Sequence, residues 1–377
     1  MSQSADPNHF FQTSTALEET TRKEAKAKNN NGDPIRLKSK LLAVEADPLS
    51  RKHVYVAEST AIVQRVNIET GAVEATFTGP SAPVTSIAFS LSGDVLFAGC
   101  WDKCIWSWDV TTRKVVHKYE GHADFVKSVL CTVIDGKEAL VSSGSDAQVM
   151  VWDIQTKKKI DVIKGLHVRG VHGLALDPET IEPEKEKYPT LFTAGSDRTI
   201  QHIQLAPNAS DRVPSLAPIT EHATSVFTLF FDADGDLWTA SADKTAKCLS
   251  RQRNWATELT LNHPDFVRDV IVHELGGWVV TACRDEEVRV WNRATGELYH
   301  TYSGHFEEVT GLVLIENTVI SISIDGTIRK WSLERAHLHK AKEEAANPPV
   351  EEETKKETGL TEEEERELAE LMDDLDD

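Results

Sequence analysis

The stretch SGSDAQVMVWD, residues 143–153, places a carboxylate in a turn and follows it with an alternating apolar run that ends in a tryptophan. Asp146 precedes Trp152 by six residues. The same spacing recurs along the chain, with an aliphatic residue replacing the tryptophan in two copies: Asp102 and Trp108, Asp146 and Trp152, Asp197 and Ile203, Asp243 and Leu249, Asp285 and Trp291, and Asp325 and Trp331. A turn acid at a constant distance from a strand residue predicts a chain built from similar β units.

Three other positions repeat in register with these pairs. A hydroxyl residue stands four positions before the Asp in most copies, at Ser142, Thr193, Thr239, Thr281 and Ser321, with Ala98 as the exception. A histidine lies upstream of these five, at His122, His167, His222, His263 and His305, and a valine stands four residues after each histidine. Successive valines, from Val84 to Val309, are 42, 45, 55, 41 and 42 residues apart.

A repeat of about 40–45 residues with Gly-His and Trp-Asp marks is typical of one family of propeller blades. Here the marks are Gly121-His122, Gly304-His305, Trp108-Asp109 and Trp152-Asp153, and the chain resembles the WD40 repeat family over residues 33–333. The resemblance implies an all-β, seven-bladed WD40 β-propeller with four strands in each blade. Residues 41–68 alternate as strands and form the first blade, although they lack the His, the Asp and the Trp. By the same resemblance, residues 33–40 supply the outer strand that the last blade lacks.

The resemblance also assigns a role to the repeated polar residues. In the family, the His, the Ser or Thr, the Asp and the Trp of one blade form a hydrogen-bonded chain that supports the fold. Three complete structural sets are expected: His122, Ser142, Asp146 and Trp152; His263, Thr281, Asp285 and Trp291; and His305, Ser321, Asp325 and Trp331. The same residue types could form a nucleophile, base and orienting acid. Because catalysis needs one site and this pattern appears five times, we favour the structural interpretation.

No other pattern in the sequence indicates an enzyme, a metal site or a cofactor. Walker, HExxH, GxSxG and Rossmann glycine motifs are absent from the sequence. Five cysteines without a CxxC pair argue against a disulfide framework or a zinc site. We therefore expect no catalytic activity, no metal and no cofactor.

In the family, three positions in each blade commonly face the narrow, top opening of the ring: the residues on either side of the first-strand valine and the residue before the turn Asp. The candidate partner-binding residues are Lys40, Trp101, Phe125, Lys127, His172, Phe227, Phe266, Arg268 and Arg284. Aromatic and arginine side chains are frequent anchors of protein interfaces. The pattern indicates a basic-aromatic top face that binds an acidic or mixed peptide. The alternative is that several of these side chains only fill the channel wall.

The two ends of the chain differ from the repeats. Residues 1–32 are interpreted as a flexible N-terminal arm in which 15–32 can form a short helix. Residues 334–377 carry 17 acidic and 6 basic residues and are interpreted as an acidic linker followed by a short C-terminal helix. A capping box at Thr361 and Glu364 starts that helix, and Leu368, Leu371, Met372 and Leu375 form an apolar stripe. The stripe favours binding of a partner, at least one partner being basic, over a tail that only increases solubility.

Composition narrows the setting of these sites. The formal charge of −20 and the pI near 5.2 oppose a dominant phosphate-binding footprint, so contact with nucleic acid is at most indirect. The sequence has no long apolar run and no signal-peptide plan, which predicts a protein without membrane contact in the cytoplasm or nucleus. The predicted function is a non-catalytic scaffold or adaptor within a multiprotein complex. The alternative is a non-catalytic subunit, or a client-shielding factor, of a ribosome- or RNA-related complex.

Overall fold

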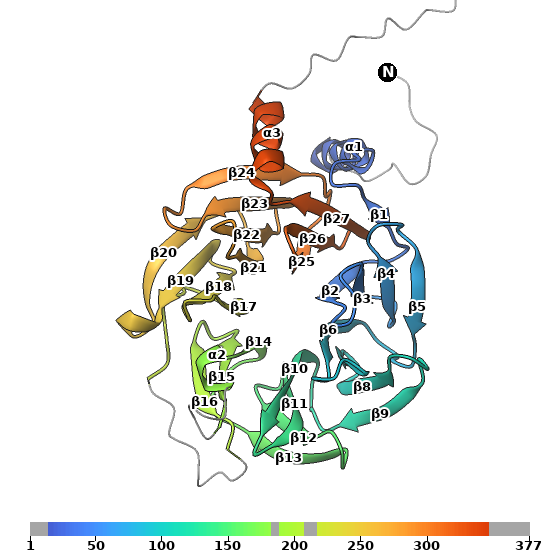
Figure 1. The fold of residues 1–377 in the computed structure, drawn as a ribbon, viewed down its shortest axis with the longest axis vertical. Helices are drawn as coiled ribbons and strands as arrows, with labels where there is room; N and C mark the ends of the chain where they lie inside the picture. Colours follow the sequence, from blue (N-terminus) through green and yellow to red (C-terminus); the bar gives the residue numbers. More distant parts are fainter. Residues whose placement is uncertain (1–13, 182–187, 207–216, 347–377) are drawn as a thin grey trace, which may run out of the picture. The chain divides into compact units, whose positions relative to one another are not determined.

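A computed structural model describes residues 14–181, 188–206 and 217–346. Within these residues, seven antiparallel sheets follow one another around a central axis (Figure 1), which confirms the all-β, seven-bladed propeller. The chain divides after Leu338 into a unit that holds the propeller and a C-terminal unit. No helix among the described residues is long and apolar enough to cross a membrane.

The first four blades follow the order of the chain, each from its inner strand outward. Blade one contains β2 (Leu41–Ala46), β3 (His53–Glu58), β4 (Val63–Asn67) and β5 (Val73–Phe77). Blade two contains β6 (Val84–Phe89), β7 (Val95–Cys100), β8 (Cys104–Asp109) and β9 (Val115–Glu120). Blade three contains β10 (Val126–Ile134), β11 (Lys137–Gly144), β12 (Val149–Asp153) and β13 (Lys158–Ile163). Blade four contains β14 (Val171–Leu176), β15 (Thr190–Gly195) and β16 (Ile200–Gln204).

The remaining blades continue around the ring. Blade five contains β17 (Val226–Phe231), β18 (Leu237–Ser241), β19 (Thr245–Ser250) and β20 (Ala256–Asn262). Blade six contains β21 (Val267–His273), β22 (Trp278–Cys283), β23 (Glu287–Asn292) and β24 (Leu298–Ser303). Blade seven contains β25 (Val309–Ile315), β26 (Thr318–Ser323) and β27 (Thr327–Ser332). The helical segments are α1 (Ser14–Ala27), α2 (Pro178–Ile181), the 3₁₀ turn η3 (Arg251–Arg253) and α3 (Arg335–Ala346).

The core lies between neighbouring blades rather than inside any one of them. Every residue of β22 is buried, because blade six is covered on both faces. Val280 and Val290 of blade six belong to the same apolar cluster as Val309 and Leu312 of blade seven. Strands buried on both faces are apolar at successive positions, which explains the runs that flank each turn Asp.

Blade four differs from the expected four strands. Its described part has three strands, and a single bridge between Ile200 and Ile219 stands where the outer strand was predicted. The sequence between them contains Pro207, Pro214 and Pro218. Pro218, the residue before the bridge, has no backbone N–H to donate to a strand ladder.

Strand β1 (Ile35–Arg36) completes blade seven by pairing with β27, as expected from the family resemblance. The chain before β1 is fastened to the same blade. The guanidinium of the fully buried Arg329 donates hydrogen bonds to the backbone oxygens of Asn29 and Asn31. Gly32 has a φ of 71°, and a Cβ at this position would lie 2.7 Å from the ring of Trp331. The closure therefore needs glycine at residue 32.

Both ends of the described chain are helical. Helix α1 corresponds to the short helix expected after Thr15. Helix α3 was not anticipated: residues 335–346 were interpreted as part of an acidic linker. Its sequence supports a helix through side-chain pairs four residues apart, Lys340 with Glu344 and His339 with Glu343. The linker at 346–359 and the stripe of Leu368, Leu371, Met372 and Leu375 lie outside the described residues, apart from Ala346 at the end of α3.

The expected hydrogen-bonded chain is continuous in blade three. His122 Nδ1 lies 3.0 Å from Asp146 Oδ2, His122 Nε2 lies 2.8 Å from Ser142 Oγ, and Trp152 Nε1 donates to Ser142 Oγ at 2.9 Å. Because the carboxylate only accepts, Nδ1 carries the ring proton and Nε2 accepts from the hydroxyl. Blade seven repeats the arrangement with His305, Ser321, Asp325 and Trp331 at 2.7–3.1 Å.

Blade six requires a correction. His263 Nε2 and Trp291 Nε1 both bond to Thr281, at 2.8 and 2.9 Å, but the other ring nitrogen of His263 faces the backbone oxygen of Leu261 at 3.1 Å and not Asp285. Both oxygens of Asp285 accept from the guanidinium of Arg289 instead. A charged, two-pronged donor binds a carboxylate more strongly than a neutral imidazole does. Asp285 therefore does not belong to the chain expected for this blade.

We predict that replacing Gly32 with alanine destabilises the ring more than the same change at Gly136. Both glycines have a left-handed φ, 71° and 72°, but a Cβ at Gly136 would meet nothing within 4 Å. The backbone penalty of about 1 kcal/mol is common to both substitutions, and only Gly32→Ala adds a clash with Trp331. Thermal unfolding followed by circular dichroism should give a clearly lower Tm for Gly32→Ala. Equal Tm values would contradict the role of Gly32 in closure.

We also predict that stability falls between pH 6.5 and 4 in part because of His263. Burial, with a further contribution from the Arg289 charge, lowers the pKa of His263 to about 4. In this window the unfolded chain binds a proton at this residue while the folded chain does not, so acidification favours unfolding, by on the order of 1–3 kcal/mol. His263→Gln should show a shallower loss of Tm from pH 6.5 to 4.5 than the wild type. The exposed His339→Gln serves as the control and should leave the slope unchanged.

Candidate functional site

The inner strand of each blade carries a bulge immediately after its first residue. The register with the second strand shifts once in every blade, between the first and third residues of the inner strand. The skipped residues are Leu42, Thr85, Lys127, His172, Phe227, Arg268 and Thr310, and all of them line the central channel, whose volume is about 860 Å³. A bulge re-aims one side chain away from the ladder. Here it directs equivalent residues of all seven blades into one channel mouth.

A backbone hydrogen bond joins the two other expected positions in every blade. The residue before the turn Asp, or its equivalent in blade one, donates its N–H to the carbonyl of the residue before the inner strand. The pairs are Ser59 and Lys40, Trp101 and Pro83, Ser145 and Phe125, Ser196 and Gly170, Ala242 and Ser225, Arg284 and Phe266, and Ile324 and Glu308. The predicted positions therefore lie together in the structure. Of the predicted residues, Trp101, Lys127, His172, Phe227 and Arg268 line the channel. The other predicted residues of the propeller do not line it: Lys40, Phe125, Phe266 and Arg284.

Aromatic rings from two blades stack beside the mouth. The rings of Trp101 and Phe125 are 5.1 Å apart with an interplanar angle of 16°. The ammonium of Lys127 lies over both, 5.3 Å from the Trp101 ring and 5.8 Å from the Phe125 ring. No carboxylate of the described residues lies within ion-pair distance of Lys127, although Asp124 acts on it from farther away. The cation is held by π faces, which leave its charge unneutralised.

A second cation and aromatic pair lies on blades five and six. The Arg268 guanidinium is centred 4.5 Å from the ring of Phe227, and it also forms an ion pair with Glu308 of blade seven. His172 packs edge-on against Phe227, and its Nε2 lies 2.6 Å from Ser196 Oγ. Lys127, His172, Phe227 and Arg268 thus form an arc over four successive blades, hereafter the mouth arc.

A third cation and aromatic pair lies on blade six, next to the start of its inner strand. Arg284 lies over the ring of Phe266 at 5.2 Å and is 3.9 Å from Asp265. About half of the Arg284 side chain is exposed. Phe266, Arg268 and Arg284 therefore come from one blade, but of the three only Arg268 lines the channel.

The field at the mouth is positive. Burial, with a smaller contribution from Arg268, lowers the pKa of Lys127. Burial lowers the pKa of His172 to about 4, and the charges of Lys127 and Arg268 act in the same direction. His172 is therefore neutral near pH 7 and contributes hydrogen bonding rather than charge.

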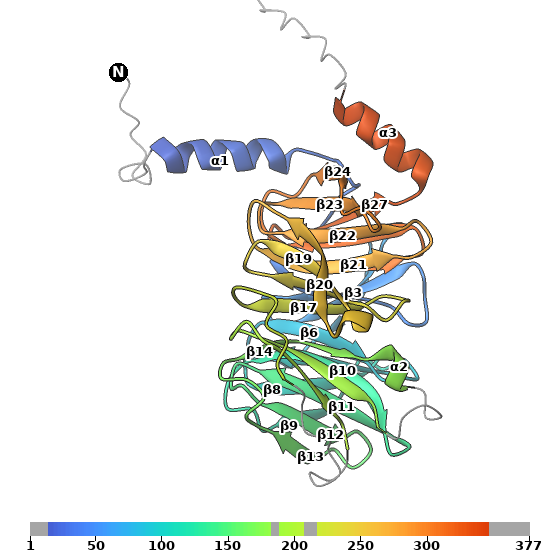
Figure 2. The same cartoon turned by 90° about the vertical axis from the view of Figure 1, so that its left-hand side faces the viewer.

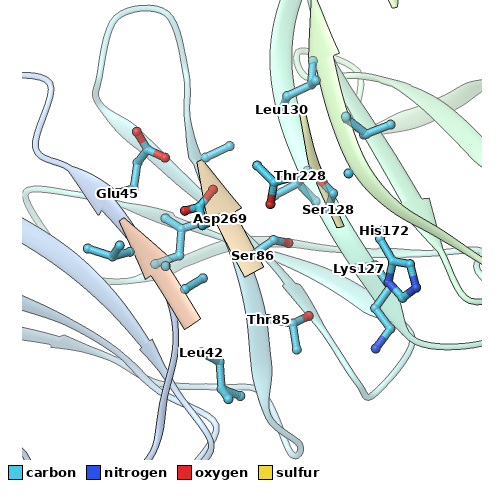
Figure 3. A pocket seen from close by; sticks show the side chains of 18 of the residues that line it. Leu42, Glu45, Thr85, Ser86, Lys127, Ser128, Leu130, His172, Thr228 and Asp269 are labelled. Atoms are coloured by element: carbon cyan, nitrogen blue, oxygen red, sulfur yellow. The ribbon is translucent and has the colours of Figure 1, made fainter. Parts of the chain in front are cut away.

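Deeper in the channel the sign changes. Glu45 and Asp269 line the channel away from Lys127 and His172 (Figure 3). Burial raises the pKa of both carboxyls to about 7, and the charge of Asp269 adds to the effect on Glu45. Asp269 accepts the backbone N–H of Leu312 in the next blade at 2.8 Å. Its role in the fold is thus to tie blade six to blade seven.

Two members of the bulged set also have structural roles. The hydroxyls of Thr85 and Thr310 donate to the backbone oxygens of Val126 and Leu41, at 2.8 and 2.9 Å, and so join neighbouring blades. Neither threonine is among the partner-binding residues predicted from the sequence.

One group of possible metal ligands occurs among the described residues: Asp232, Asp236 and Cys248. Asp232 already accepts from the indole of Trp238 at 2.9 Å and pairs with Arg293 at 2.9 Å. Burial raises the pKa of the Cys248 thiol to about 12, which opposes the thiolate that a metal would need. In this cluster the charge of Asp232 is thus balanced by Arg293.

Comparison with known proteins agrees with this geometry. The family description "WD domain, G-beta repeat" matches residues 71–109, 113–153 and 256–292. An uncharacterized WD repeat-containing protein of Schizosaccharomyces pombe is 34% identical over 99% of this chain and 100% of its own length. A periodic tryptophan protein 2 homologue of the same organism is 34% identical over 26% of this chain and 11% of its length. A WD repeat-containing protein 26 homologue of Arabidopsis thaliana is 23% identical over 76% of this chain and 47% of its length. From its blades, its channel mouth and a relative matched from end to end, the chain belongs to the WD40 repeat family.

Proposed function

We propose that this chain is a non-catalytic scaffold inside the cell that binds an acidic or mixed-charge segment of a partner protein at the channel mouth. One observation carries the proposal: Lys127 lines the channel, and its ammonium lies over the stacked rings of Trp101 and Phe125 without a carboxylate partner among the described residues. The half-buried ammonium of Lys127 has already lost part of its hydration in the free protein, which is unfavourable. An ion pair with a carboxylate of a partner would offset this unfavourable free energy.

The arrangement of the arc suits an extended segment. Phe227 and Trp101 offer apolar surface on either side of Lys127 and His172, and Arg268 is partly engaged by Glu308. An acidic side chain on the partner can pair with Lys127 while its apolar neighbours cover the rings. Aromatic and cationic anchors that flank a central pocket are where most binding energy concentrates in protein interfaces.

The burial of the repeated hydroxyls supports a role without catalysis. Ser142, Thr281 and Ser321 are fully buried, and each is bonded to both a histidine and an indole. A nucleophile must reach its substrate with a free lone pair. These hydroxyls are committed to the fold.

We predict that Lys127→Met weakens binding of an acidic peptide by roughly tenfold or more. Methionine keeps an apolar stem over the rings and removes only the charge. The measurement is binding of short acidic peptides from an array, with the strongest binder titrated by fluorescence anisotropy. A paired array in which Glu and Asp become Gln and Asn should bind neither protein.

Lys103→Met is the matched control, because Lys103 is an exposed cation on the same face that does not line the channel. It should retain wild-type affinity. Equal losses for both variants would reject the mouth as the binding site. Association with cell extract that disappears after nuclease treatment, with no acidic peptide bound, would favour the alternative of a subunit in a ribosome- or RNA-related complex.

A further inference from the structure

Three carboxylates form an acidic site on blades six and seven: Glu286, Glu287 and Glu307. Glu286 follows the turn Asp of blade six and has a φ of 78°. Equivalent left-handed positions in other blades carry Lys103, Ala147, Arg198 and Lys244, so blade six alone among them presents an acid here. Glu287 begins β23, and Glu307 precedes β25. The site is separate from the mouth arc and has the opposite charge.

Helix α1 occupies this site through ion pairs. Glu286 accepts from Arg22 and from Lys26, each at 2.7 Å. Lys26 also reaches Glu287 at 3.0 Å, and Lys23 reaches Glu307 at 2.8 Å. The contacts come from residues one turn apart, so a single helical face presents Arg22 and Lys26 to the same carboxylate.

The described side chains of α1 make contact with the propeller through charge and bury little apolar surface. Leu17 is 41% exposed, and Ala25 is exposed as well. Figure 2 shows α1 beside the edge of the propeller near β24 rather than between two sheets. Ion pairs with little apolar burial contribute modest net stability and weaken as salt rises. Helix α1 is therefore expected to bind the propeller weakly enough for a competing ligand to displace it.

With α1 in place, the carboxylates of the acidic site are largely covered. The side chains of Glu286 and Glu287 are only 8% and 16% exposed. One oxygen of Glu287, Oε2, is buried and has no hydrogen-bond donor. Lys26 bridges Glu286 and Glu287, so these two carboxylates lie close together, and their mutual repulsion favours a positively charged ligand whenever α1 is absent. The unfilled acceptor shows that α1 does not use every bond the site offers, and an arginine, with five N–H donors, could supply the missing one.

We propose that the acidic site docks a basic helix of a partner protein, with cations one turn apart, and that α1 is its resident occupant in the free protein. The incoming helix replaces α1 residue for residue at Glu286 and Glu287. This proposal goes beyond the scaffold function at the mouth and does not rest on it. It gives the molecule a second surface for a partner of the opposite charge.

The apparent affinity of a free basic helix for the acidic site depends on its competition with α1, which is tethered to the same chain. A segment attached by a short linker acts at an effective concentration in the millimolar range. A free peptide of similar intrinsic affinity is therefore almost excluded from the wild-type protein. Weakening the grip of α1 should make the site accessible.

The experiment uses the full chain and a fluorescent synthetic peptide with the sequence of residues 14–31, followed by anisotropy. The unlatched variant is Arg22→Ala, Lys23→Ala and Lys26→Ala, which leaves the closing residues 29–36 intact. We expect it to bind the peptide at least roughly tenfold tighter than the wild type, with affinity falling as salt rises. The control is Lys28→Ala, Lys38→Ala and Lys114→Ala, which removes three exposed cations that form no ion pair among the described residues.

Adding Glu286→Gln and Glu287→Gln to the unlatched variant should abolish its increase in peptide affinity. Glu307→Gln, at a more exposed position, should reduce that increase. It replaces the double change in the experiment if circular dichroism shows that the double change impairs folding. Equal binding by the unlatched variant and the wild type would overturn the proposal, as would a gain that survives the glutamine changes. A dimer of the unlatched variant in light scattering would also overturn it, because a second copy would then be the occupant.

Discussion

The ring depends on a closing strand of two residues. Ile35 pairs with Ile328 and Arg36 with Thr327, and no further register is shared between β1 and β27. Such a short ladder needs support from its flanks. The backbone N–H of Lys330 donates to Gly32 and that of Leu37 to Gly326, at 2.7 and 2.8 Å, while Arg329 holds the chain upstream. Closure thus fixes residues 29–37 on blade seven. Because α1 ends just before them, the position of α1 beside the acidic site follows from the way the ring is closed.

The bulge of the inner strands connects the fold with the mouth. Every blade uses it, so geometry alone places seven side chains in one channel, and the residue type then decides what each one does. Threonine ties adjacent blades through backbone oxygens. The cationic and aromatic side chains of the set are grouped on blades three to six, and they line the channel: Lys127, His172, Phe227 and Arg268. The fold supplies the array, and the sequence makes one arc of it chemically distinct.

The sequence was sufficient for the blades, because they rest on short-range spacing repeated many times. The Asp-to-Trp spacing and the valine series located the inner strands of blades two to seven, and the residue after each valine lines the channel, whereas the residue before it does not. Contacts between charged groups far apart in the chain could not be predicted. Arg22 and Glu286 are 264 residues apart, and the pattern of charges along a sequence does not show which distant residues form an ion pair. Helix α3 had a local signal in its side-chain pairs, but the acidic composition of the tail outweighed it. The apolar stripe near Leu371 stays a prediction.

Blade six shows how one electrostatic constraint accounts for two departures from the family pattern. Asp285, Glu286 and Glu287 are consecutive, so the turn concentrates three carboxylates where the equivalent turns of blades two to five and seven have one Asp. Burial would raise the pKa of Asp285, but hydrogen bonds and charge from Arg289 outweigh it and lower that pKa. A neutral histidine supplies a donor but no charge, and it is therefore displaced to the carbonyl of Leu261, which preserves its tautomer and its bond to Thr281. On the outer side of the same turn, Arg22 and Lys26 neutralise the other two acids. The broken link at His263 and the docking of α1 are two responses to one excess of negative charge, and any ligand that replaces α1 must meet the same requirement.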